Sequence, residues 1–263
     1  MDLAALAGTS YGPHPFHVSF GNVADFVDAT DGDPSRWDNA APPGFIAAAL
    51  FVVAPDLLGQ LSDRSVIHGE QSFAWHRPIE IGSELSVTGE VTRVRERGGV
   101  HFVGLDLGVS DARGSIAAGS SLFLISGESN PGVAAEERSE PLPGDRGNPG
   151  DGQISASRAD LIRYAAATRD WNPLHWDHAS AVDAGLAGVV THGLLQASWA
   201  FMAAADLVEG DRPLESAKVR FRNPLLPAVP VSVTLEQTGT NVSASVADDE
   251  LEYISASIEL AGQ

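Results

Sequence analysis

The chain has 263 residues, a formal net charge of −19 and no cysteine. The length fits two domains of moderate size, and the acidic charge argues against nucleic acid or an anionic membrane surface as a partner. The missing cysteines exclude disulfides and thiolate chemistry, and the N-terminus lacks the basic start of a signal peptide, so we expect a cytoplasmic protein. No run looks long or apolar enough to span a bilayer.

The first half is predicted to hold a short helix, an acidic loop, a buried helix and then strands. The helix falls around residues 23–27, and the loop covers residues 31–38. Residues 44–51 are apolar on every side, which is typical of a buried helix rather than a surface one. Apolar residues alternate at 85–91 and 102–107, which predicts antiparallel strands.

A segment rich in proline, glycine, serine and acidic residues follows, from about 128 to 153. Such a composition buries little apolar surface and is typical of a linker. We therefore predict a first domain over residues 1–127 and a second over residues 154–263.

The second half begins with a helix whose start is well marked. Ser157 is predicted to cap it, with Asp160 at the third helical position, and the helix should run through Tyr164 to about Thr168. Residues 193–201 form a second apolar segment that predicts another buried helix. Period-two runs at 231–235 and 254–260 predict further strands.

The two halves repeat one order of features. Aligning Asp31 with Asp170 also pairs the prolines and tryptophans that follow, and each loop leads into a glycine that opens a buried helix. A buried helix followed by antiparallel strands is an α+β unit, with the sheet wrapped on the helix. Two such units in tandem can pair their sheets and leave fewer exposed edges.

The loop of the second half carries a candidate acid/base pair. Asp170 and His175 lie five residues apart, and Pro173 forces the chain to turn between them. Both side chains can then face one water molecule, which is the arrangement that general acid/base chemistry needs. Asn172 can orient the pair through its amide. The first copy has Arg36 in place of the histidine, so we expect no catalysis there.

A second element, Thr191-His192-Gly193, opens the buried helix of the second half. The Gly193 amide lies at the positive helix end and can stabilise an oxyanion, although the glycine can equally serve tight helix entry. His192 is expected to hold this loop through a hydrogen bond rather than to react itself.

The run from Tyr164 to Asp177, with Thr191-His192-Gly193, resembles the MaoC-like (R)-specific enoyl-CoA hydratase family, also called hydratase 2. The resemblance implies a tandem double hot-dog fold, in which the first half is degenerate and widens the acyl groove. It implies that Asp170 and His175 activate water for addition to a trans-2-enoyl thioester, or for the reverse dehydration, in fatty acid metabolism. It implies no metal and no redox cofactor, with acyl-CoA or an acyl-carrier thioester as substrate.

Two positions depart from that family's pattern. Arg169 precedes the catalytic aspartate where relatives commonly have glycine, and Ala228 stands after a proline corner where glycine is frequent. Arg169 puts the conformation of the loop in question, while both catalytic groups are retained.

An alternating basic run, Lys218-x-Arg220-x-Arg222, is a candidate phosphate-binding stripe for coenzyme A or a carrier. It can equally be the solvated face of an edge strand. Two other functions stay open for the whole chain: a hot-dog acyl-CoA thioesterase, and a non-catalytic acyl-binding subunit of a hetero-oligomeric hydratase. A homodimer of double hot-dogs is a further expectation.

Overall fold

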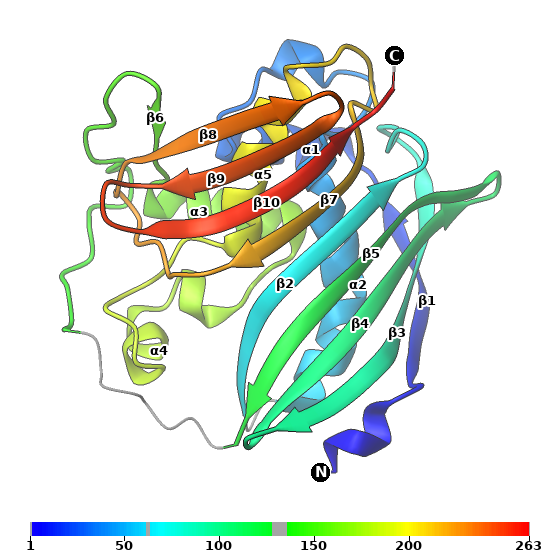
Figure 1. Ribbon diagram of the computed structural model, residues 1–263, viewed down its shortest axis with the longest axis horizontal. Coiled ribbons are helices and arrows are strands. Elements are labelled where there is room, and N and C mark those ends of the chain that lie inside the picture. Colours follow the sequence, from blue (N-terminus) through cyan, green and yellow to red (C-terminus); the bar gives the residue numbers. More distant parts are fainter. Residues whose placement is uncertain (1, 62–63, 128–135, 263) are drawn as a thin grey trace.

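The computed structural model describes residues 2–61, 64–127 and 136–262. Its core is one antiparallel sheet of ten strands, in the order β1-β3-β4-β5-β2-β7-β10-β9-β8-β6 (Figure 1). The strands are β1 (Ser10–His17), β2 (Ser65–Trp75), β3 (Glu84–Arg97), β4 (Val100–Asp111), β5 (Gly114–Ser126), β6 (Gln153–Ile154), β7 (Leu214–Phe221), β8 (Val231–Thr238), β9 (Asn241–Ala247) and β10 (Glu252–Leu260). The α-helices are α1 (Phe20–Ala29), α2 (Ile46–Leu58), α3 (Arg158–Thr168), α4 (His178–Asp183) and α5 (Gly193–Ala205).

The sheet consists of two five-stranded groups joined in its middle by β2 and β7. In that pair, Gln71 lies opposite Val219 and Phe73 lies opposite Ala217. Helix α2 lies behind the first group of strands and α5 behind the second (Figure 1). The predicted α+β architecture, with antiparallel sheets wrapped on central helices and paired with each other, is confirmed.

The central helix of the first half is longer than we expected. Continuous with short 3-10 turns at both ends, it runs over Pro43–Leu61, and its length and hydropathy would allow it to cross a membrane. The expectation that no such segment exists was therefore wrong. In this structure 61% of the most apolar 18-residue stretch of this helix is buried against the sheet and the other helices. Such burial is expected of the core helix of a wrapped sheet.

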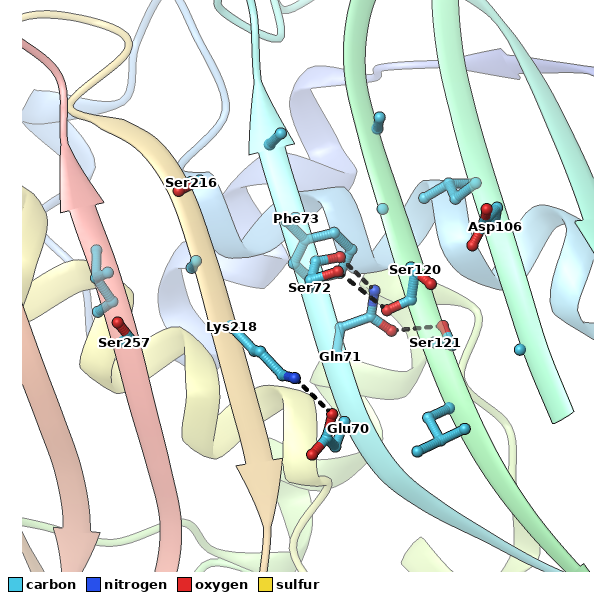
Figure 2. Close-up of a pocket in the computed structure, with 18 of the residues that line it drawn as sticks. Glu70, Gln71, Ser72, Phe73, Asp106, Ser120, Ser121, Ser216, Lys218 and Ser257 are labelled. Carbon is cyan, nitrogen blue, oxygen red and sulfur yellow. Dashed lines mark hydrogen bonds and ion pairs between the residues drawn. The ribbon is translucent and has the colours of Figure 1, made fainter. Parts of the chain in front are cut away.

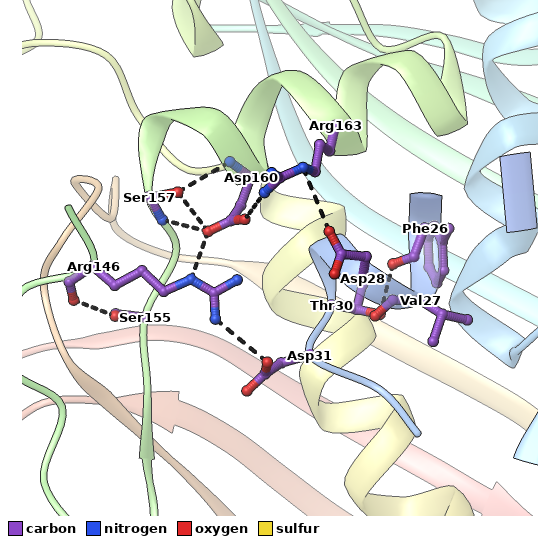
Figure 3. Close-up of polar contacts among 10 residues, drawn as sticks. All are labelled: Phe26, Val27, Asp28, Thr30, Asp31, Arg146, Ser155, Ser157, Asp160 and Arg163. Atoms are coloured by element: carbon purple, nitrogen blue, oxygen red, sulfur yellow. Dashed lines mark hydrogen bonds and ion pairs between the residues drawn. The ribbon is translucent and has the colours of Figure 1, made fainter. Parts of the chain in front are cut away.

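Helix α3 begins as predicted. Ser157 and Asp160 form a reciprocal capping box, in which the Ser157 side chain accepts from the Asp160 amide and the Asp160 carboxylate accepts from the Ser157 amide. The carboxylate is only 1% exposed and also receives Arg146 Nε at 2.8 Å (Figure 3). A buried carboxylate needs such partners, since an unpaired one is costly.

Arg146 comes from the segment predicted to be a linker, and it joins the two halves. Its second contact is Asp31 of the first half, at 3.3 Å, and nearby Arg163 of α3 reaches Asp28 at 3.4 Å (Figure 3). Residues 136–152 thus contact both halves of the fold. Residues 128–135 of that segment lie outside the described residues, and the domain limits at 127 and 153 stay predictions.

Candidate active site

The loop that follows α3 has the predicted turn. Thr168 ends the helix, Arg169 adopts a left-handed backbone with φ 66°, and Asp170 comes next. A 3-10 turn, η5 (Pro173–His175), then brings the chain back, and Asn172 caps it by accepting a hydrogen bond from the Leu174 amide at 3.2 Å. The Asn172 side chain is exposed and shapes the turn.

Asp170, His175 and His192 are brought together. One carboxylate oxygen of Asp170 and one ring nitrogen of each histidine all lie within 4.8 Å of one another. His175 Nδ1 lies 2.7 Å from the Val190 carbonyl, and His192 Nε2 lies 3.2 Å from the Asp170 carbonyl. Because a carbonyl oxygen only accepts, His175 Nδ1 and His192 Nε2 carry hydrogens, and in a neutral imidazole the opposite nitrogen is an acceptor.

The electrostatics of the site follow from its burial. Asp170 is 7% exposed, and desolvation raises the pKa of its carboxyl, an effect that the neighbouring His175 partly opposes. Burial also lowers the pKa of His192 well below its ordinary value, with the charge of His175 acting in the same direction. A carboxyl whose pKa is shifted toward neutrality is suited to proton transfer.

Several buried polar atoms around this group have no hydrogen-bond partner among the described residues. They belong to Tyr164 (hydroxyl), Thr191 (Oγ1), His192 (Nδ1) and Gln196 (Oε1). Unpaired buried polar atoms are rare in folded proteins and call for water or a ligand. No role was predicted for Tyr164 or Gln196, although a glutamine in a helix that is apolar except for Ser198 was a usable signal.

Gly193 opens α5 as predicted, and its α-carbon lies close against the Phe221 ring. A Cβ at this position would come within 2.7 Å of that ring. The glycine is therefore required by packing. This supports tight helix entry and leaves the oxyanion role of its amide as a proposal.

Both departures from the family pattern fall at left-handed positions. Arg169 has φ 66° and Ala228 has φ 61°. Glycine adopts this region without strain, which explains why it is frequent there. The Arg169 guanidinium lies over the Phe16 ring, 5.5 Å from its centroid. The arginine thus keeps the glycine-like backbone at the cost of strain.

The structure corrects the alignment of the two loops by one residue. Thr30 and Thr168 end their helices in the same way, each donating to the carbonyl four residues earlier. The next residue is left-handed in both copies, Asp31 with φ 58° and Arg169 with φ 66°. Asp31 is therefore the counterpart of Arg169 rather than of Asp170. The second loop has one extra residue before its turn.

Arg36, where the second copy has His175, performs a structural task. Its guanidinium donates to the carbonyls of Ala205 and Val208 at 2.5 and 2.7 Å and pairs with Asp206 at 2.6 Å. These groups lie at or just beyond the carboxyl end of α5, where the last carbonyls and the helix dipole favour a cation. The first loop thus caps the central helix of the second half.

The basic stripe lies away from the acid/base pair. Lys218 and Arg220 are exposed on the outer face of β7, while Val219 between them is buried on the inner face. Both pair with Glu70 of β2, at 2.8 and 2.9 Å (Figure 2 shows the lysine). Because β7 pairs with strands on both sides, the edge-strand interpretation was wrong.

Arg222 lies just beyond β7 and pairs with Glu252 at 2.5 Å. A groove of about 890 Å³ lies on the outer face of the sheet, and Lys218 is one of its lining residues (Figure 2). Asp170, His175 and His192 do not line it. The structure therefore does not bring the stripe together with Asp170 and His175. A role of Lys218, Arg220 and Arg222 in substrate binding stays a prediction.

Two family models match the chain, one in each half. Residues 146–257 match the MaoC like domain, and residues 5–119 match the FAS1-like dehydratase domain region. A UPF0336 protein of Streptomyces avermitilis is 31% identical over 129 residues, which cover 42% of this chain and 85% of that protein. The peroxisomal multifunctional enzyme type 2 of Drosophila melanogaster is 25% identical over 223 residues, 76% of this chain and 37% of that enzyme.

Solved structures agree on the fold. HtdX of Mycobacterium tuberculosis superposes with a TM-score of 0.74 at 20% identity, covering 96% of this chain and 100% of that one. A second protein of that organism, described as a double hot-dog, gives a TM-score of 0.64 at 12% identity, covering 97% and 96%. The chain belongs to the MaoC-like dehydratase family and has the double hot-dog fold.

Proposed function

We propose that this protein catalyses the reversible hydration of trans-2-enoyl thioesters to (3R)-3-hydroxyacyl thioesters, with Asp170 and His175 as the acid/base pair. The observation that carries the proposal is the meeting of a buried carboxylate and an imidazole with unpaired buried polar atoms around them. Membership of a dehydratase family supports a hydro-lyase. The second loop supports one active site per chain, since the first has Arg36 engaged in helix capping.

The chemistry follows from the hydrogen bonds. The Val190 carbonyl holds His175 with hydrogen on Nδ1, so Nε2 and the Asp170 carboxylate can both accept from one water. As the water oxygen bonds to the β-carbon, one of its protons passes to the pair. The pair returns a proton to the α-carbon, so one water adds and no proton is left behind. The Gly193 amide is the proposed donor to the enolate oxygen.

The test is a hydration assay with trans-2-enoyl-CoA substrates of increasing chain length, followed by chiral analysis of the product. We expect loss of the conjugated enoyl absorbance and a 3R product. No hydration of any substrate would contradict the proposal. Release of free coenzyme A, detected with a thiol reagent, would indicate a thioesterase instead. Activity that appears only with a second protein would indicate a non-catalytic subunit.

A further inference from the structure

The segment before β6 is tied to the backbone that supports the candidate site. The Arg138 amide donates to the Ala187 carbonyl at 2.7 Å. Two residues later, Glu140 Oε1 accepts from the Val189 amide at 2.9 Å. Two hydrogen bonds thus hold residues 138–140 along residues 187–189.

Glu140 is firmly held in this position. Its side chain is 15% exposed, and the same Oε1 also accepts from His178 Nδ1 at 2.5 Å. Its other oxygen pairs with Arg158 Nε at 3.1 Å. Gly188 lets the carboxylate approach the backbone, because a Cβ there would collide with Glu140 Oε1. A charged acceptor with several donors makes stronger hydrogen bonds than a neutral one.

The backbone held by Glu140 leads directly to His175. One residue on, the Val190 amide donates to the Leu174 carbonyl at 3.0 Å, and the Val190 carbonyl accepts from His175 Nδ1 at 2.7 Å. The position of that carbonyl sets which ring nitrogen carries the hydrogen and where the opposite nitrogen points.

We propose that Glu140 is a positioning residue for His175, acting through the Val189–Val190 backbone. Its carboxylate holds the Val189 amide, and the Val190 carbonyl that orients the imidazole lies two peptide units further along the same backbone, so a residue of the predicted linker sets the geometry of the candidate site. The expected effect of Glu140 on kcat rests on the proposed function. The orientation of the ring can be tested separately.

The experiment compares Glu140→Ala, Glu140→Gln and Gly188→Ala with the parent, in kcat, KM and nitrogen-15 NMR of the His175 ring. Glu140→Ala removes the acceptor of the Val189 amide, and Gly188→Ala displaces the carboxylate without deleting it. We expect kcat to fall about tenfold or more in both, with KM within about twofold, because small displacements of a catalytic group are costly. Glu140→Gln keeps an acceptor oxygen and should recover most of kcat.

The matched control is Glu137→Gln. Glu137 contacts the same histidine, His178 Nε2 at 3.2 Å, and is exposed. It should leave kcat and the His175 signals unchanged. In Glu140→Ala the nitrogen-15 signals of His175 should no longer show one tautomer with the hydrogen on Nδ1. Thermal unfolding of the same variant checks that it is folded.

Two results would overturn the proposal: unchanged His175 signals in Glu140→Ala and Gly188→Ala, or a kcat within about twofold of the parent in both. If the parent hydrates no enoyl thioester, the proposed function fails. The NMR comparison then still decides whether Glu140 orients His175.

Discussion

The imidazole rings of His175 and His192 are stacked, with 3.8 Å between their centroids and 25° between their planes. Two charged rings at this distance would repel each other strongly away from water. Burial and the neighbouring His175 lower the pKa of His192 well below its ordinary value, so His192 stays neutral. His192 donates a hydrogen bond to the Asp170 carbonyl and stacks against the His175 ring. Because it stays neutral, it does not repel a protonated His175.

His192→Ala should reduce turnover without removing a reacting group. The change deletes the donor to the Asp170 carbonyl and the ring on which His175 rests. We expect kcat to fall by roughly ten- to a hundredfold, the scale of an ångström-sized misplacement, with little change in KM. Steady-state kinetics on one short enoyl-CoA measures this, and a kcat equal to that of the parent would contradict it.

Asp170→Asn should abolish activity and at the same time stabilise the fold at neutral pH. Loss of an acid/base group costs about 100-fold or more in rate. Because burial raises the folded-state pKa of Asp170, the folded protein binds this proton more tightly than the unfolded chain. Its contribution to stability is complete below the unfolded-state pKa and is lost as the pH rises through the folded-state pKa.

The measurement is denaturant unfolding of Asp170→Asn and the parent at several pH values from acid to neutral. The asparagine cannot ionise, so the stability advantage of the variant should grow as the pH rises. Asp248→Asn is the comparison, since hydrogen bonds, the largest from Tyr253, lower the pKa of Asp248 and give the opposite sign. If the difference in the free energy of unfolding between Asp170→Asn and the parent did not change with pH, folding would not shift the pKa of Asp170.

Arg36→Gln should destabilise the protein and spare the chemistry. The guanidinium donates to two carbonyls at the carboxyl end of α5, and hydrogen bonds to a charged group are worth about 1.5–3 kcal/mol. We expect a loss of about 2 kcal/mol in the free energy of unfolding, with kcat changed little. Arg113→Gln removes a guanidinium that is itself 58% exposed and pairs with Glu80 and Asp111, and it should cost less than about 1 kcal/mol. Equal losses would contradict the capping role.

Ala228→Gly should stabilise the fold. Ala228 has φ 61°, which costs an L-residue roughly 1–2 kcal/mol, while the added freedom of glycine in the unfolded chain offsets part of the gain. We expect a net gain of about 0.5–1 kcal/mol by denaturant unfolding. At Arg169, replacement by glycine should be more stable than replacement by alanine, because both lose the Phe16 contact and only glycine relieves the backbone. The reverse order would contradict this account.

Chelation should leave hydration unchanged. Donor atoms of Asp170, His175 and His192 lie within 4.8 Å of one another, a spread that a divalent ion can bridge. The acid/base proposal needs no metal, so dialysis against a chelator followed by assay should give the same kcat. Loss of activity that returns with added zinc would replace the acid/base mechanism with a metal-activated water.

Much of the local structure was determined by the sequence. The capping box of Ser157 and Asp160, the buried helix that begins at Gly193 and the turn at Pro173 depend on neighbours within a few residues, so their signals are short and direct. The proposed pairing of Asp170 with His175 follows from the same kind of signal, because the turn between them is local. The repeat also predicted two paired sheets.

Only the tertiary structure decided what depends on contacts distant in sequence. Arg36 meets the end of α5 across 170 residues, and Glu140 holds the backbone that orients His175 although its surroundings are typical of a linker. Lys218 alternates with its neighbours as a binding stripe would, yet the closing of β2 onto β7 places it beside Glu70 on the outer face. Periodicity gives the face of a strand, whereas the partner across that face is fixed by packing and charge neutralisation in the folded chain.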